Sequence, residues 1–172
     1  GTNQRTDGYG GSMAARGRFA VEVIEACRSE VGSDFPIILR WSQWKQQDFT
    51  ARLASTPQLL EGFLQPLIDA GVDAFHCSQR RFWEPEFDDS DLNLAGWVKK
   101  LTGMPTITVG SVSLDQDFVS QPSEGDGATS EPASIDRLLE MMDRGDFDLV
   151  AVGRALIANP DWPKVVRSGS TA

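Results

Sequence analysis

Histidine and cysteine are both scarce in this chain. Its 172 residues include one histidine, His76, and two cysteines, Cys27 and Cys77. A single histidine argues against a metal cluster or a histidine-based catalytic triad built within the chain. Two cysteines do not form the framework of a disulfide-stabilised fold, and they fit a reducing, cytoplasmic setting. We therefore predict no metal site and no disulfide.

Basic charge and long apolar runs are also missing. The chain has 16 lysines and arginines against 25 aspartates and glutamates, which gives a formal net charge of −9 at pH 7. A surface of this sign is a poor partner for nucleic acid and for anionic membranes. No apolar run approaches the roughly 20 residues that a membrane-spanning helix needs. The polar, glycine-rich first residues are unlike a signal peptide.

The sequence does contain a regular alternation of strand and helix patterns. Short, continuously apolar runs predict four strands, at residues 36–42, 73–78, 105–110 and 149–152. Amphipathic patterns predict helices at residues 13–29, 56–70, 92–101 and 135–144, with a short amphipathic tail at 163–167. This rhythm is typical of an α/β fold with a parallel sheet, whose strands we expect to be covered on both faces. Pro66 is expected to kink or shorten the second helix.

Two successive strand ends carry the residues that suit a phosphate group. Gly153 and Arg154 follow the last strand, where glycine admits a ligand close to the backbone and the planar guanidinium matches a phosphate. A helical turn expected after them would present free N–H groups to an anion. Residues 110–112 end the preceding strand with a similar small, polar stretch. Arg40 ends the first strand, and from the residues alone a surface ion pair is the simpler interpretation of it.

Two motifs resemble those of a known family. Residues 152–162 read VGRALIANPDW, and residues 3–19 read NQRTDGYGGSMAARGRF. Both resemble the Old Yellow Enzyme family, which comprises FMN-dependent ene-reductases built on a TIM barrel. The chain departs from the second motif at Ala15, where family members usually carry asparagine.

The resemblance implies a TIM-barrel (β/α)8 fold of which this chain is a part. A complete barrel takes about 250 residues, and only four strands are found in the 172 present. By the resemblance, residues 1–172 are the C-terminal half barrel, with strands five to eight. A segment near 121–132, rich in serine, glycine and glutamate, is expected to be a flexible insertion.

The resemblance also implies the cofactors and their contacts. FMN would be the bound cofactor, NADH or NADPH the reductant, and a small-molecule electron-poor alkene the substrate. In this family the arginine at the position of Arg40 lies beside the pyrimidine edge of the flavin. The remaining predicted contacts, around the ribityl phosphate, are Gly110, Ser111, Val112, Gly153 and Arg154.

No catalytic residue is expected in this chain. The family's substrate-binding His/Asn or His/His pair would lie upstream of Gly1, and so would its tyrosine proton donor. His76 belongs to a different strand end, and we expect it to be a packed or loosely exposed histidine. Tyr9 belongs to the motif at residues 3–19, where Arg5, Asp7 and Tyr9 are expected to tie the loop together. The chain alone is therefore expected to be inactive.

Two other hypotheses remain open from the sequence. The chain could be a half barrel whose main property is association, because strands at 37–41 and 149–152 would leave exposed edges for a second copy or an N-terminal half. It could also belong to another phosphate-binding TIM-barrel enzyme that acts on a sugar phosphate. Trp41, Trp44 and Trp83 either line a pocket mouth or pack in the core.

Overall fold

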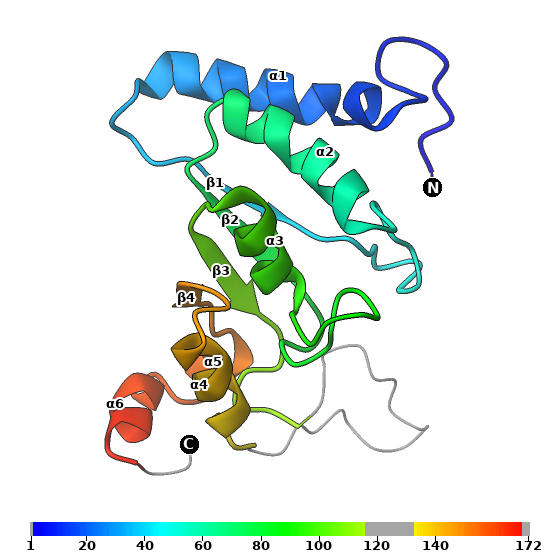
Figure 1. The fold of residues 1–172 in the computed structure, drawn as a ribbon. Coiled ribbons are helices and arrows are strands. Elements are labelled where there is room, and N and C mark those ends of the chain that lie inside the picture. The colour runs from blue at the N-terminus through cyan, green and yellow to red at the C-terminus, as the bar shows by residue number, and fades with distance from the viewer. Residues whose placement is uncertain (1, 116–132, 170–172) are drawn as a thin grey trace.

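The computed structural model describes residues 2–115 and 133–169, and within them helices and strands alternate along the chain (Figure 1). The helices are α1 (Met13–Val31), α2 (Pro57–Asp69), α3 (Leu94–Thr102), α4 (Asp136–Asp143), α5 (Arg154–Ala158) and α6 (Trp162–Arg167). The strands are β1 (Ile38–Trp41), β2 (Ala74–Ser78), β3 (Thr106–Val109) and β4 (Leu149–Val150).

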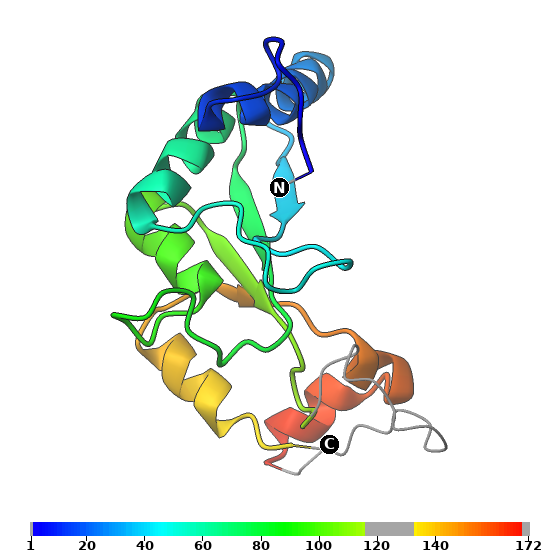
Figure 2. The same ribbon diagram turned by 90° about the vertical axis from the view of Figure 1, so that its right-hand side faces the viewer.

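The four strands form one parallel sheet in the order β1-β2-β3-β4. Each strand pairs with the next one along the chain, and Arg40 of β1 lies opposite His76 of β2. Helix α1 packs on α2, α2 on α3, and α3 on strands β2 and β3. Helices α1, α2, α3 and α4 form an arc along one side of the sheet, and α5 and α6 lie outside this arc (Figure 2). The predicted α/β fold with a parallel sheet is confirmed.

Only one face of the sheet is covered by helices within the described residues. Side chains alternate along each strand, and those on the helix side, such as Phe75 and Cys77, are buried. Their neighbours on the other face are partly exposed, and Ile38 and Leu149 are 53% and 58% exposed. The expectation that both faces are covered is therefore wrong for this part of the chain. We call the uncovered side the open face.

The main helices begin where side chains cap their first N–H groups. Ser12 Oγ accepts from the Ala15 N–H at 3.2 Å, and Thr56 caps α2 in the same way. Asn93 caps α3 with a 2.9 Å hydrogen bond from Gly96, and its amide also donates to Thr108 Oγ1 of β3 at 3.0 Å. Asn93 is fully buried, so this one side chain fixes α3 against the sheet.

Pro66 does not shorten α2, which continues for three more residues to Asp69, close to the predicted end. One strand boundary differs from the sequence prediction. Strand β4 covers only residues 149–150 of the predicted 149–152, because only Ile107 and Thr108 of β3 lie in register with it. The predicted insertion at 121–132 lies outside the described residues.

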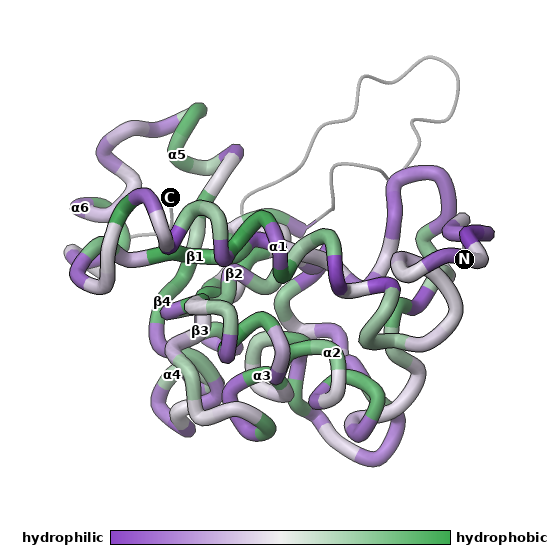
Figure 3. The backbone as a smooth tube through the Cα atoms, turned by 90° about the horizontal axis from the view of Figure 1, so that it is seen from above, coloured by the Kyte–Doolittle hydropathy of each residue, from purple (hydrophilic) through white to green (hydrophobic). Residues whose placement is uncertain are grey.

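The loop before α1 is hydrophilic and internally bonded (Figure 3). Arg5 Nε donates to Asp7 Oδ1 at 2.9 Å, and the same oxygen accepts from the Tyr9 N–H at 3.1 Å. The Tyr9 hydroxyl donates to the carboxylate of Glu22 on α1. The predicted structural role of Arg5, Asp7 and Tyr9 is confirmed.

Arg28 joins three segments at the amino ends of the first two strands. Its guanidinium donates to the carbonyls of Gly32 and Phe35 at 2.8 and 2.6 Å, and to that of Gly71 at 2.6 Å. It also pairs with the carboxylate of Asp73.

Asp73 in turn accepts from the N–H of Ile37, 2.7 Å away. That N–H and the Arg28 charge lower the pKa of Asp73. Because the folded-state pKa is depressed, this contribution to stability is present above the ordinary pKa of aspartate and is lost as the pH falls.

We predict that Arg28→Met lowers the free energy of unfolding at pH 7 by about 2 kcal/mol, because several carbonyls and a carboxylate lose a charged donor. Urea denaturation measures the change. Arg16→Met, at an exposed position of the same helix, is the control and should change the midpoint little. Equal midpoints for the two variants would contradict the role given to Arg28.

Candidate functional site

A cavity of about 330 Å³ opens at the carboxyl ends of all four strands. In a parallel sheet these ends meet at one edge, where α/β proteins commonly bind ligands. Its lining residues come from the last residues of the strands and from the segments that follow them: Arg40, Trp44, Gln46, Ser78, Gln79, Arg80, Val109, Gly110, Ser111, Val112, Leu114, Ala151, Gly153 and Arg154.

All six residues predicted to contact a flavin line this one cavity. Arg40 comes from β1, residues 110–112 follow β3, and Gly153 and Arg154 follow β4. These segments are more than 40 residues apart in the sequence, and the parallel register brings them together. Their proposed contacts with a flavin stay a prediction, since the structure shows the cavity and no ligand.

The turn after β3 has an unusual backbone. Gly110 has a φ of 136°, and Ser111 and Ser113 have φ values of 49° and 60°, in the left-handed region that side chains other than glycine rarely adopt. A Cβ at Gly110 would lie 2.7 Å from the carbonyl oxygen of Gln79, so this position requires glycine. Strained turns of this kind cluster at ligand sites.

Ser111 ties this turn to the two neighbouring strand ends. Its hydroxyl donates to the carbonyl oxygen of Arg80 at 3.2 Å and accepts from Arg154 Nη2 at 3.4 Å. The Ser111 hydroxyl, which was predicted to contact a phosphate, thus also makes hydrogen bonds within the protein. Arg154 is the first residue of α5, as the expected helical turn after Gly153 requires.

Space is open beside Gly153. A Cβ built there would meet no atom within 4 Å, in contrast to Gly110. The chain itself therefore does not require glycine at this position for packing. The bare backbone leaves room for a ligand to approach it, as the sequence predicted.

The cavity is positively charged in an acidic protein. Arg40, Arg80 and Arg154 line it, and no aspartate or glutamate is among the lining residues in the described ranges. The whole chain carries a formal charge of −9. A concave site lined by one sign of charge concentrates ligands of the opposite sign. The described lining therefore favours an anion over a cation.

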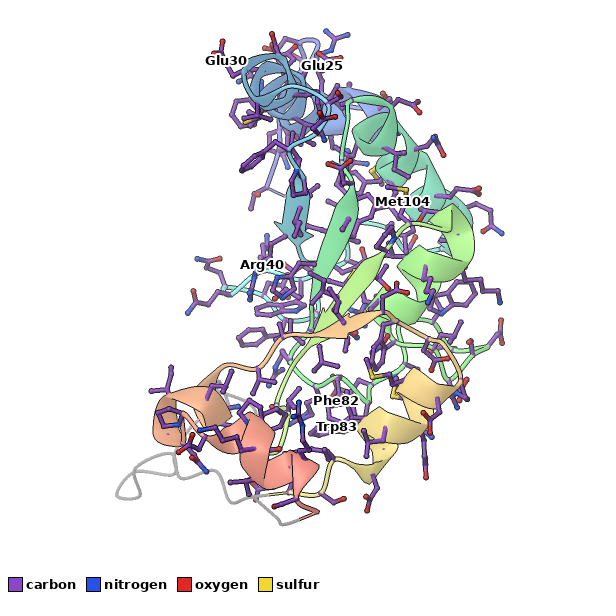
Figure 4. The ribbon with its side chains drawn as sticks, turned by 90° about the vertical axis from the view of Figure 1, so that its left-hand side faces the viewer. Glu25, Glu30, Arg40, Phe82, Trp83 and Met104 are labelled. Atoms are coloured by element: carbon purple, nitrogen blue, oxygen red, sulfur yellow. The ribbon has the colours of Figure 1, made fainter. Side chains whose placement is uncertain are left out.

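Arg40 lies on the open face, pointing away from the helices (Figure 4). Its Nη2 donates to Ser78 Oγ at 3.2 Å, which places the guanidinium between two strand ends. Burial and the charge of Arg40 lower the pKa of His76, its neighbour in register. His76 is partly buried on the same face as Arg40 and is not among the residues that line the cavity.

One wall of the cavity comes from residues whose role was not identified from the sequence. Trp44 and Gln46 follow β1, and Gln79 and Arg80 follow β2. The signal for the last two was their place directly after an apolar strand. The sequence left undecided whether three tryptophans line a pocket or pack in the core, and of these Trp44 lines the cavity. Trp41 packs on Phe63 with ring centroids 5.5 Å apart.

Trp83 forms an edge contact with Phe82, with ring centroids 5.0 Å apart.

Across residues 2–115 and 133–169, no three histidine, cysteine or acidic side chains gather as metal ligands. No helix of the described chain is long and apolar enough to span a bilayer. Cys27 and Cys77 are both free thiols.

Known relatives match along nearly the whole chain. A family model described as the NADH:flavin oxidoreductase / NADH oxidase family matches residues 1–129. NADH oxidase from Thermoanaerobacter brockii is 31% identical over 176 residues, which is 98% of this chain and 23% of that protein. Cinnamate reductase from Clostridium sporogenes is 28% identical over 183 residues, covering 95% of this chain and 24% of that protein. The chain thus spans about a quarter of these relatives.

Solved structures share the fold. A morphinone reductase variant in complex with tetrahydroNAD superposes with a TM-score of 0.68 at 24% identity, covering 99% of this chain and 39% of that one. An old yellow enzyme homologue from Zymomonas mobilis gives a TM-score of 0.67 at 20% identity, over 98% and 41% of the two chains.

These structures show an Old Yellow Enzyme type of α/β fold for the part that is present. The family model covers three quarters of the residues, including the first of the two motifs. The chain therefore belongs to the NADH:flavin oxidoreductase / NADH oxidase family, the Old Yellow Enzyme family that its motifs indicated.

Proposed function

We propose that this chain is the flavin-phosphate-binding half of an FMN-dependent oxidoreductase, corresponding to strands five to eight of a TIM barrel. The observation that carries the proposal is one cavity, lined by three arginines and without a carboxylate among the described lining residues, at the carboxyl ends of all four strands. Its size and charge suit part of a flat, anionic cofactor better than a neutral ligand.

The phosphate end of the cofactor fits between the last two strand ends. The left-handed turn at Gly110 and Ser111 lines the cavity, and Gly153, which also lines it, has no atom within 4 Å of the place where a Cβ would stand. Arg154 supplies the permanent charge, and its contact with Ser111 orients the guanidinium. Family membership favours a flavin over the sugar phosphate considered from the sequence.

The ring end of the cofactor fits toward Arg40 and Trp44. A fixed cation at Arg40 stabilises negative charge on the pyrimidine edge of the ring. Trp44 offers an aromatic wall to a planar ligand. When bound, FMN would supply hydride transfer from NADH or NADPH to an electron-poor alkene. The chain's own residues would bind and orient the cofactor and polarise its ring, and none of them is assigned as a proton donor.

The substrate is proposed to be a small conjugated alkene, supported by cinnamate reductase and bilirubin reductases among the relatives. We propose that turnover needs residues outside this chain, because it spans only a fraction of each relative. A reducing, cytoplasmic location is supported by the two free thiols.

We predict that the purified chain binds FMN and quenches its fluorescence. Arg154→Gln should weaken FMN binding by about tenfold, since a charged hydrogen bond to the phosphate contributes roughly 1.5–3 kcal/mol. Binding of riboflavin, which lacks the phosphate, should change little in Arg154→Gln. Arg40→Gln should weaken the two ligands equally, because it faces the ring.

Arg16→Gln is the matched control, because it removes the same charge from an exposed position outside the cavity. No FMN binding by the unaltered chain would contradict the proposal. An equal loss of FMN and riboflavin in Arg154→Gln would contradict the assignment of the phosphate end.

A second property, self-association, is favoured by the open face. Ile38 and Leu149 lie at the two edges of the sheet and are more than half exposed. Apolar strands with free edges pair with other chains. A second copy, or an N-terminal half of the barrel, would cover this face.

We predict that the chain sediments as a dimer at high concentration, and that Ile38→Glu with Leu149→Glu shifts it to the monomer. Ile157→Glu is the control, since Ile157 is an apolar side chain that is even more exposed, at 83%, but belongs to α5 rather than the sheet. Sedimentation equilibrium would reject self-association if the unaltered chain stayed monomeric throughout.

A further inference from the structure

A buried carboxylate joins the two loops that form one wall of the cavity. The first loop, residues 43–54, follows β1 and is here called the rim loop. The second, residues 79–93, follows β2 and contains Glu86, whose side chain is 3% exposed. Glu86 Oε1 accepts from Gln43 Nε2 at 3.1 Å and lies 3.4 Å from Arg52 Nη1. Both partners belong to the rim loop, one at each of its ends.

Gln43 closes the base of the rim loop. Its Nε2 donates to the Ala54 carbonyl at 2.9 Å, and its Oε1 accepts from the Ala54 N–H at 2.8 Å. The Leu53 N–H also donates to the Gln43 carbonyl at 3.1 Å. Ala54 is fully buried and Gln43 nearly so. The two ends of the rim loop are therefore held together by three hydrogen bonds shielded from water.

The rim loop carries part of the cavity wall. Trp44 and Gln46 line the cavity, and Trp44 packs on Phe49 with ring centroids 5.3 Å apart. The guanidinium of Arg80 lies over the Phe49 ring, 4.4 Å from its centroid. Because Arg80 belongs to the second loop, the two loops meet twice, through Glu86 at the base and through Arg80 at the tip.

We propose that Glu86 is a positioning residue, which holds the rim loop against the cavity so that Trp44 and Gln46 face the bound ligand. The identity of that ligand as FMN rests on the function proposed above, whereas the restraint of the loop does not.

The burial of Glu86 is costly for a carboxylate. It raises the pKa of Glu86, while the Arg52 charge and the Gln43 hydrogen bond oppose the rise. A buried acid is retained at a stable position only when its partners satisfy it. Here the partners are the two ends of one loop, so loss of the carboxylate releases that loop.

Limited trypsin digestion tests the restraint, because Lys45 and Arg52 both lie in the rim loop. In Glu86→Ala we expect cleavage after these two residues to accelerate by about tenfold, since local opening controls access to the protease. Mass spectrometry of the first fragments identifies the sites. Glu86→Gln keeps an oxygen acceptor for Gln43 and should be cleaved at nearly the unaltered rate.

The affinity of the variants for FMN tests whether Glu86 positions the rim loop against the cavity. Glu86→Ala should weaken binding by about tenfold, and Glu86→Gln should restore it to within about threefold. In a Trp44→Ala, Gln46→Ala background, Glu86→Ala should cause no further loss, since the residues it positions are gone. A general loss of stability would persist in that background, so the comparison separates the two explanations.

Glu84→Ala is the matched control. Glu84 lies two residues earlier in the same loop, is half-exposed and pairs with Arg81 rather than with the rim loop. Arg52→Met serves if Glu86→Ala does not fold, because Arg52 is partly exposed and its loss removes one of the two contacts.

Unchanged trypsin cleavage after Lys45, the site that both variants keep, in Glu86→Ala and Arg52→Met would overturn the proposal. So would faster cleavage combined with unaltered FMN affinity. If the unaltered chain binds no FMN, the proposed function fails, and the digestion then decides alone whether Glu86 holds the loop.

Discussion

The parallel hydrogen-bond register of the sheet is the constraint on which the site depends. Because all four strands run the same way and each pairs with the next, their carboxyl ends meet at one edge. Residues 40, 110–112 and 153–154 are far apart in the sequence and line one cavity for this reason. Helix packing on one face, anchored by Asn93 and Arg28, keeps that register in place.

The charged residues that line the cavity are opposite in sign to the net charge of the protein. Acidic residues dominate the chain, yet the described residues of the cavity include three arginines and no carboxylate. The nearby acid, Glu86, is buried behind the cavity wall, where its carboxylate contacts Gln43 and Arg52 of the rim loop. A concave site lined by cations can attract an anion even in a chain whose net charge is negative.

The flavin contact of Arg40 came from the family resemblance, and the contacts of all six site residues with a flavin remain a prediction. Local sequence signals predicted the strands and most helix ends. They succeeded because apolar runs, capping residues and strand-end glycines act over a few positions, as at Ser12, Asn93 and Gly110. They failed where distant segments decide the outcome. Nothing local distinguishes Trp44 in the cavity wall from Trp41 in the helix-facing core, or shows that Glu86 reaches Gln43. The exposure of the open face likewise depends on which chains surround it.

Amide hydrogen exchange of the chain with and without FMN tests the central claim most directly. The account predicts that FMN slows exchange at residues 110–112 and 153–154, where backbone groups face the cavity. The hydrophilic loop before α1 should exchange at the same rate in both samples. Protection confined to that loop, or no protection at the two strand ends, would contradict the assignment of the cavity as the phosphate site.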